Sequence, residues 1–375
     1  VLSHGHEDGA SILRFTDNGR LFLTEGHYVE ISARRHNTML VSHDGVSYAP
    51  PPLVSLESKA SLGSAGLVEV LSSAYNGVDW RRSLLWLPEE AIVVVDRLTA
   101  REPGEYSFEA LWRSLGDARL SDNGAFTVDQ QGESMTISRA DDSLCRAREM
   151  LDYHGINYYG SYPYCSDGLV KELRQAQQHR LQPGESSSFL NVIQTHRTGQ
   201  APAAVRRLPG DALLVDSGSN RFVAGTGQPT LKGAPDTDAR LWIVRESGAI
   251  AVAEATRFRW GALTVTTSAP ASYSLTFAPA RLTADCSAPT TYHLELQGKS
   301  LDGSMERGSV ELPGLAAPSQ PLFAEQFRAL ESLATTPPVA IPAPSTAQPT
   351  ARPLWQTELP PVPRLVTSEA GTRVA

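Results

Sequence analysis

The feature that most constrains the fold is the alternation, from Leu40 to about Leu312, of short apolar runs with turn residues. Runs of this length and spacing are typical of stacked antiparallel sheets, and helical periodicity is nearly absent over the same span. The sequence therefore predicts an all-β fold, a large antiparallel multi-strand β-sandwich. The clearest strands are expected at residues 39–42, 66–74, 80–87, 91–98 and 106–115.

The strand expected at 91–98 allows two more specific predictions. The strand at 91–98 is continuously apolar as far as Val95, which indicates a strand that is covered on both faces. Asp96 and Arg97 follow at once, and we expect them to form an ion pair that closes the strand end.

The composition changes after Pro313. Residues 322–333 carry apolar side chains at helical spacing, which predicts a short amphipathic helix. The stretch after it, rich in Pro, Ala and Thr, is typical of an extended linker. We therefore divide the chain into a β-sandwich region (1–313), a short helix with a Pro-rich linker (314–353) and the truncated start of a further β domain (354–375).

The charge balance limits the classes of partner. The chain has 33 Lys and Arg against 41 Asp and Glu, a net charge of −8, which gives no indication of a nucleic acid or an anionic membrane as partner. No run of eighteen apolar residues is present, so no membrane span is expected. The first residue is Val1 and no signal peptide precedes the first expected strand, so we expect a fragment or a processed piece.

Two histidine segments indicate a candidate site. The first holds His4 and His6, which point to the same face of an extended segment because strand side chains repeat every second residue. His36 lies in the second, and between them the turn Asp17-Asn18-Gly19 predicts a hairpin that returns the chain to its starting point.

Acidic side chains accompany these histidines. Asp8 and Glu25 lie close to them in sequence, and imidazole and carboxylate are the ligands that zinc takes. The alternative is a pair of surface histidines beside an acidic turn.

The segments HGHEDGASILRFTDNGRLFLTEGHY and RRHNTMLV resemble the start of the C-terminal β-sandwich domain of the heparinase II/III-like polysaccharide lyases, a family that includes oligo-alginate and heparan sulfate lyases. The family pattern is His-x-His-x-Asp, an apolar strand, a glycine turn, a strand ending Asp-x-Gly-x-Tyr, and then His-Asn-Thr. The resemblance is specific over residues 3–41, fair to about 115 and faint beyond about 200. It implies that His4 is a catalytic residue that faces the substrate, and that His6 and His36 bind a structural zinc ion.

The third zinc ligand does not transfer directly. The family's Asp falls on Thr24, and the nearest acid is Glu25, one residue later, where a strand side chain points to the opposite face. Three alternatives remain: a bulge brings Glu25 to the metal, Asp8 replaces it, or the site is metal-free and held by hydrogen bonds.

Three residues are candidates for substrate binding. Tyr28 would make a second contact with the substrate or serve in packing, and Arg35 would supply local positive charge or be solvated. Tyr159 lies in a tyrosine-rich loop at 153–164, which would stack on a sugar ring or cover the edge of the sandwich, and which resembles a Tyr-Ser-x-x-Tyr segment of the family.

The resemblance implies a lyase component that cleaves a uronic-acid-containing polysaccharide by β-elimination. The partner would be an acidic polysaccharide, in the periplasm or cell envelope, and the catalytic base and acid would come from an N-terminal (α/α) toroid that is not in this sequence. This chain alone would then be incomplete as an enzyme. The alternatives are a noncatalytic carbohydrate-binding or structural β-sandwich, and a zinc hydrolase that uses an open coordination position.

Overall fold

The computed structural model describes residues 7–25, 32–51, 53–151, 169–218, 220–229, 232–277, 279–313, 315 and 320–336. The chain divides into two compact units, 1–340 and 341–375, and every described residue belongs to the first. The predicted linker beyond residue 336 and the predicted further β domain lie outside the described residues.

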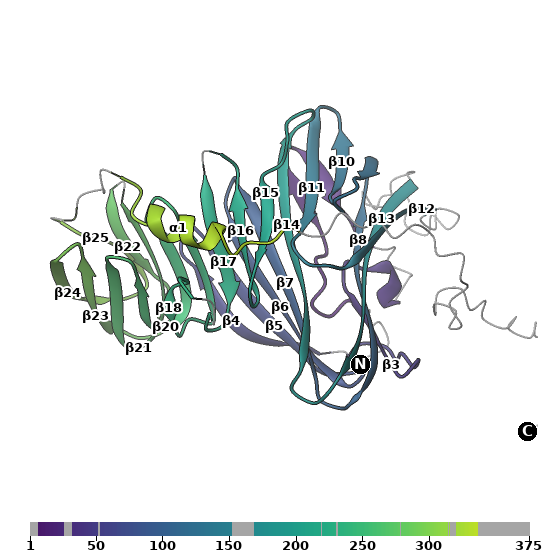
Figure 1. Cartoon of the computed structure of the whole chain (residues 1–375), viewed down its shortest axis with the longest axis horizontal. Helices are drawn as coiled ribbons and strands as arrows, with labels where there is room; N and C mark the ends of the chain where they lie inside the picture. Colours follow the sequence, from purple (N-terminus) through teal and green to yellow (C-terminus); the bar gives the residue numbers. More distant parts are fainter. Residues whose placement is uncertain are drawn as a thin grey trace, which may run out of the picture. The chain divides into compact units, whose positions relative to one another are not determined.

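The described part of the chain folds into three antiparallel sheets, which confirms the predicted all-β class (Figure 1). The first, sheet A, has six strands in the order β1-β2-β8-β13-β12, with β3 also paired to β8. Its strands are β1 (Phe15–Asp17), β2 (Arg20–Leu23), β3 (Met39–His43), β8 (Gly104–Ser114), β12 (Leu144–Leu151) and β13 (Leu169–Leu181).

The second, sheet B, has eight strands in the order β4-β5-β6-β7-β14-β11-β10-β9. Its strands are β4 (Ser55–Ser61), β5 (Gly66–Tyr75), β6 (Val78–Leu87), β7 (Ala91–Ala100), β9 (Asp117–Leu120), β10 (Phe126–Gln130), β11 (Glu133–Arg139) and β14 (Ser186–Arg197).

The third, sheet C, has eleven strands, with the main order β15-β16-β17-β19-β20-β21-β22-β25. β18 pairs with β20, and β23 pairs with β21 and β24. Its strands are β15 (Ala204–Leu208), β16 (Ala212–Asp216), β17 (Arg221–Thr226), β18 (Asp236–Thr237), β19 (Leu241–Arg245), β20 (Ile250–Trp260), β21 (Leu263–Phe277), β22 (Ala280–Ala284), β23 (Thr290–Leu296), β24 (Lys299–Met305) and β25 (Gly308–Glu311).

Sheet B is the middle layer of the stack. On β7, Val93 and Val95 are buried in the core shared with sheet C, whereas Val94 is buried in the core shared with sheet A. Successive strand residues face opposite sides, so a strand between two layers buries residues on both of its faces. The apolar run at 91–98 is therefore covered on both faces, as predicted.

The predicted helix is present as α1 (Ala324–Glu331). Its buried residues Phe327 and Leu330 join the core of sheet C, and Trp260 of β20 packs on Phe327 with ring centroids 5.5 Å apart. Among the described residues, no helix is long and apolar enough to cross a membrane.

One strand escapes prediction from the sequence pattern. β13 pairs with β8 over residues 171–181, although several of its buried residues are polar. Glu172 and Gln175 are fully buried, and Gln177 is nearly so. These side chains bond residues of neighbouring strands, so the strand buries polar groups beside the apolar Leu173.

The predicted ion pair between Asp96 and Arg97 is wrong. Neighbouring strand residues point to opposite faces, so the two side chains diverge. Asp96 turns toward sheet A and pairs with Arg82, Nε to Oδ1 at 2.7 Å. Arg97 turns toward sheet C and pairs with Asp211 at 2.8 Å.

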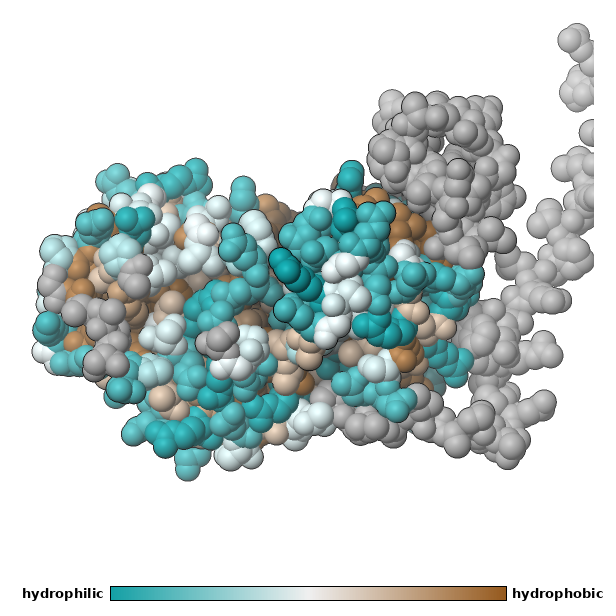
Figure 2. Space-filling view, turned by 90° about the horizontal axis from the view of Figure 1, so that it is seen from above, coloured by the Kyte–Doolittle hydropathy of each residue, from teal (hydrophilic) through white to brown (hydrophobic). Residues whose placement is uncertain are grey.

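The surface is mixed in polarity. On the face that Figure 2 shows, hydrophilic side chains predominate and apolar side chains are exposed in smaller areas. Among the described residues, Tyr48 and Leu53 are large apolar side chains with high exposure. Such singly exposed apolar residues are common in soluble folds and do not define a site.

Candidate functional site

The predicted hairpin exists and sets the position of the candidate site. β1 and β2 are joined by Asn18 and Gly19, whose φ angles are 48° and 69°. Two consecutive positive φ values characterise the type I′ turn, which the Asn-Gly pair favours. β2 ends at Leu23, opposite Ser114 of β8, and the chain then runs alongside the segment 36–38.

His36 and Glu25 are brought together at this place. The Nδ1 atom of His36 contacts Oε2 of Glu25, and the other carboxylate oxygen, Oε1, accepts hydrogen bonds from the Ser11 hydroxyl and, at 3.3 Å, from the Asn37 backbone N–H. The His36 side chain is 3% exposed and that of Glu25 is 16% exposed. We call the group formed by His36, Glu25 and Asn37 the His36 corner.

Glu25 reaches His36 because β2 has already ended. The backbone N–H of Thr24 still donates to the Arg113 carbonyl at 3.1 Å, and the Thr24 side chain is buried. Glu25 lies one residue further, outside the strand, where the alternation of faces no longer applies. The irregularity in the β1–β2 ladder lies earlier, between Phe15 and Thr16, so no bulge at Glu25 is required.

Asn37 ties the segments of the corner to sheet A. Its side-chain N–H groups donate to the carbonyls of Ile12 and Thr24 at 2.9 and 3.0 Å, and its side-chain oxygen accepts from the Arg113 backbone N–H at 2.5 Å. The residue is fully buried. One amide therefore fixes the residues before β1, those after β2, and β8 relative to one another.

A buried ion pair lies behind the corner. Arg82 of β6 bonds both carboxylate oxygens of Asp96, and Trp80 donates its indole N–H to the same carboxylate at 2.8 Å. The remaining guanidinium nitrogen, Nη1, donates to the carbonyls of Asn37 and Ala10 at 2.8 and 2.9 Å. Sequence reasoning missed this role of Arg82, although a charged residue amid the apolar residues of a strand was a signal.

Glu7, the first described residue, lies against the helical turn that precedes His36. The 3-10 helix η1 (Ala33–Arg35) precedes His36, and the Ala33 N–H donates to the Glu7 carboxylate at 2.8 Å. Arg34 is exposed on this turn, and the predicted substrate contact Arg35 is half-buried. The chain is thus fixed beside His36 at the residue directly after the first histidine segment.

Several predicted site residues lie outside the described part of the chain. These are His4, His6, Tyr28 and Tyr159, together with the rest of the tyrosine-rich loop at 153–164. Asp8, the alternative ligand, is half-buried, and its carbonyl accepts a hydrogen bond from the Ser11 N–H.

The donor atoms of the corner suit zinc in chemical type, because an imidazole nitrogen and a carboxylate oxygen meet at one point. Within the described ranges, no group of three His, Cys, Asp or Glu side chains is present. The corner therefore offers two ligands, and a zinc site needs further donors from the residues that are not described.

Comparison with known proteins gives only distant likenesses. No protein-family model and no curated protein matches the chain. Among solved structures, it is similar to the heparan sulfate lyase HepC from Pedobacter heparinus (TM-score 0.44, 14% identity, 54% of this chain and 34% of that one). It is also similar to Heparinase III (TM-score 0.43, 10% identity, 83% of this chain and 37% of that one). The chain spans about a third of the length of either protein.

Proposed function

We propose that this chain is the β-sandwich part of a polysaccharide lyase that cleaves a uronic-acid-containing polysaccharide by β-elimination. The observation that carries the proposal is the contact between Glu25 and His36. Both residues lie in the segments that resemble the heparinase II/III-like lyases, His36 at a matching position and Glu25 one residue after the position of the family's Asp. The fold brings them to one corner, beside the chain that follows His6.

β-Elimination defines what such a site must supply. A base removes the proton on C5 of the uronate, the C4–C5 double bond forms, the C4–O bond breaks, and an acid gives a proton to the leaving oxygen. The C5 proton is only weakly acidic, so positive charge or hydrogen bonds must neutralise the neighbouring carboxylate. In this proposal the base and the main acid come from a helical domain outside this chain, and His4 assists them from the rim of the sandwich.

The His36 corner acts as a support in this scheme. His6, Glu25 and His36 would hold a zinc ion, which would supply fixed positive charge and orient the segment that carries His4. Asn37 and Arg82 hold that support rigid through the bonds described above. None of these residues needs to touch the substrate.

Local positive charge at this place suits an acidic polymer despite the net charge of −8. Arg34 and Arg35 lie on the turn directly before His36. We propose Arg35, Tyr28 and Tyr159 as the residues that contact the sugar chain. Breakdown of such a polymer would take place in the periplasm or at the cell envelope.

The test compares the isolated chain with the longer protein that includes its upstream region. Each is incubated with alginate, heparan sulfate and hyaluronan, and the absorbance of the unsaturated uronate product is followed. We expect turnover of one polymer by the longer protein only. Glu25→Ala and His36→Ala should lower this turnover at least tenfold, whereas His293→Ala, at a histidine on β23 of sheet C, should leave it unchanged.

Two outcomes would overturn the proposal. If the longer protein produces no unsaturated uronate from any of the three polymers but still binds one of them, the noncatalytic carbohydrate-binding module is the better description. If the isolated chain turns over at the same rate as the longer protein, the reaction is completed within these residues, and the assignment of base and acid to another domain is wrong.

A further inference from the structure

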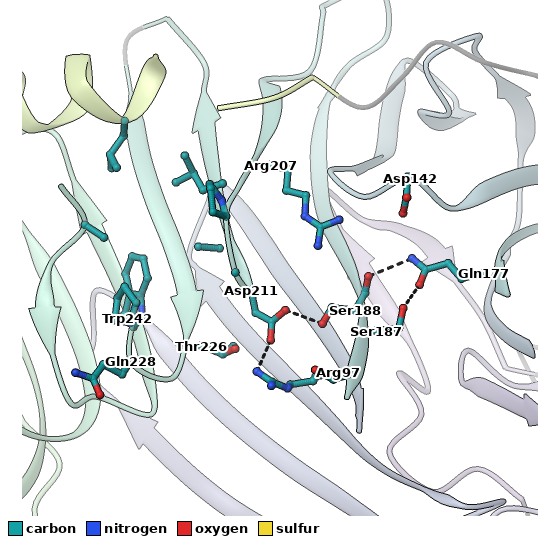
Figure 3. Close-up of a pocket in the computed structure, with 18 of the residues that line it drawn as sticks. Arg97, Asp142, Gln177, Ser187, Ser188, Arg207, Asp211, Thr226, Gln228 and Trp242 are labelled. Atoms are coloured by element: carbon teal, nitrogen blue, oxygen red, sulfur yellow. Dashed lines mark hydrogen bonds and ion pairs between the residues drawn. The ribbon is translucent and has the colours of Figure 1, made fainter. Parts of the chain in front are cut away.

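A cleft that is separate from the His36 corner lies where the three sheets approach one another (Figure 3). It has a volume of about 430 Å³ and is lined by residues of β7, β13 and β14, by the turn between β15 and β16, and by parts of β17 and β19. This size lies within the range of small-molecule sites, which occur preferentially between packed units of a fold. It shares no lining residue with the His36 corner.

One wall of the cleft is held by Asp211. Its Oδ1 accepts a hydrogen bond from the Ser188 hydroxyl at 2.6 Å, and its Oδ2 pairs with Arg97 at 2.8 Å. Gly210, with φ of 83°, allows the tight turn that presents Asp211. Because these bonds fix the turn of sheet C onto sheet B, the wall is formed before any ligand arrives.

The adjoining wall, which meets the first at the Ser188–Asp211 hydrogen bond, is a row of buried polar groups on β13 and β14. The amide of Gln177 donates to the Ser188 carbonyl at 3.1 Å and accepts from the Ser187 hydroxyl. His179, two residues along β13, lies 3.3 Å from the Gln177 oxygen. Hydroxyl, amide and imidazole groups of this kind match a ligand that is rich in hydroxyl groups.

The guanidinium of Arg207 is a positive charge in the cleft that forms no ion pair with another lining residue. Its guanidinium points into the space between the two walls (Figure 3). Within the part of the chain that the structure describes, the Arg207 side chain has no hydrogen bond or ion pair, whereas Arg97 is paired with Asp211, and Arg206 is paired with Glu331. The Arg207 backbone is fixed by two hydrogen bonds with Thr335, both 2.9 Å.

The shape of a guanidinium group decides which anion it prefers. Its planar fork of N–H donors matches a carboxylate in bidentate geometry, and such charge-assisted pairs are stronger than neutral hydrogen bonds. The exposed acid Asp142 also lines the cleft. A second negative charge on the sugar unit inside the cleft would be repelled by Asp142, whereas sugar hydroxyl groups would donate to it.

We propose that this cleft binds a single saccharide unit that bears one carboxylate. Arg207 pairs with the carboxylate, and Ser188, Gln177 and Asp142 bond the hydroxyl groups. This second site does not depend on the proposed lyase activity and goes beyond it, because it lies outside the His36 corner. In a protein that cleaves an acidic polysaccharide, the cleft would bind a sugar unit of the polysaccharide at a distance from the glycosidic bond that is cleaved.

The test is titration of the isolated chain with tetramannuronate by isothermal calorimetry, with maltotetraose as the neutral counterpart. The indole N–H of Trp242, which lines the cleft and donates to the Gly227 carbonyl at 3.0 Å, is followed by NMR as a local reporter. We expect tetramannuronate to bind and to shift the Trp242 resonance, and maltotetraose to bind about tenfold more weakly or not at all.

Single substitutions test whether tetramannuronate binds in this cleft or elsewhere on the protein. Arg207→Ala should weaken tetramannuronate binding about tenfold or more, because it removes the paired cation. The matched control is Arg206→Ala, which removes the same charge from the neighbouring residue of β15 and should leave the affinity unchanged. His36→Ala should also leave the Trp242 shift intact, so failure of the His36 corner would not be mistaken for failure of this cleft.

The opposite results would overturn the proposal. These are equal affinity of wild type and Arg207→Ala with both proteins folded by circular dichroism, equal binding of the neutral and acidic tetrasaccharides, or binding that leaves the Trp242 resonance unmoved. Because the Arg207 side chain makes no bond among the described residues, its loss should not unfold the chain.

Discussion

Replacing Asp96 by Ala should destabilise the fold strongly, because it removes the partner of a buried cation. Arg82 is 1% exposed and Asp96 is 0% exposed, so water cannot replace the lost carboxylate. Removing one member of a buried pair typically costs about 3–5 kcal/mol. Since domains are stable by about 5–15 kcal/mol, this loss should be a large fraction of the free energy of unfolding.

The assay is urea unfolding followed by tryptophan fluorescence. A double variant, Arg82→Met with Asp96→Leu, should recover most of the lost stability, because no unpaired charge is then buried. The neighbouring Arg97→Ala is the matched control. Arg97 is 46% exposed, and loss of its pair with Asp211 should cost about 1 kcal/mol or less.

The same change should loosen the His36 corner. Arg82 donates to the carbonyls of Asn37 and Ala10, so its displacement should increase hydrogen exchange of backbone amides in residues 10–12 and 36–38. A free energy of unfolding for Asp96→Ala within about 1 kcal/mol of wild type would show that the buried pair contributes little to stability, contrary to this prediction. Unchanged exchange in these segments would contradict the expected loosening of the His36 corner.

Three further predictions concern other parts of the fold. The hydrogen bond from the Ser61 N–H lowers the pKa of Asp285 below its ordinary value of 3.8, so its contribution to stability is present above that value and is lost as the pH falls through the lowered folded-state pKa. Asp285→Asn should therefore lower the free energy of unfolding, measured with urea at pH 7, by about 1 kcal/mol, with a smaller difference from wild type at about pH 3. Burial raises the pKa of the Cys145 thiol to about 11, so peptide mapping should find it alkylated slowly by iodoacetamide at about pH 8, and rapid native alkylation would contradict this. Gly225→Ala should cost about 1–3 kcal/mol in thermal unfolding, because the new Cβ would lie 2.4 Å from a ring carbon of Trp242.

The parts of the fold that sequence patterns predicted are those with a local signal. The Asn-Gly turn gave the hairpin β1–β2, the valine run gave the doubly covered strand β7, and the spacing of Phe327 and Leu330 gave the helix. Each of these features depends on residues that are close in sequence. The proximity of Glu25 and His36 could be predicted because the hairpin brings the segments on either side of it together.

The parts that escaped prediction depend on the stacking of sheets. β13 is polar because its buried Glu172 and Gln175 bond to other strands, and no periodicity signals that arrangement. The pairing of Asp96 with Arg82, and not with its neighbour, follows from which face of β7 each residue occupies. The Arg207 cleft gathers residues from all three sheets, so it exists only once the layers have packed.

The zinc content of the isolated chain shows whether Glu25 and His36 belong to a metal site. Wild type, Glu25→Ala, His36→Ala and the control His293→Ala are loaded with zinc, dialysed and analysed by inductively coupled plasma mass spectrometry. We expect about one zinc ion per chain in wild type and in the control, and its loss when either Glu25 or His36 is replaced. Wild type without bound zinc, or an undiminished zinc content in His36→Ala, would contradict this expectation.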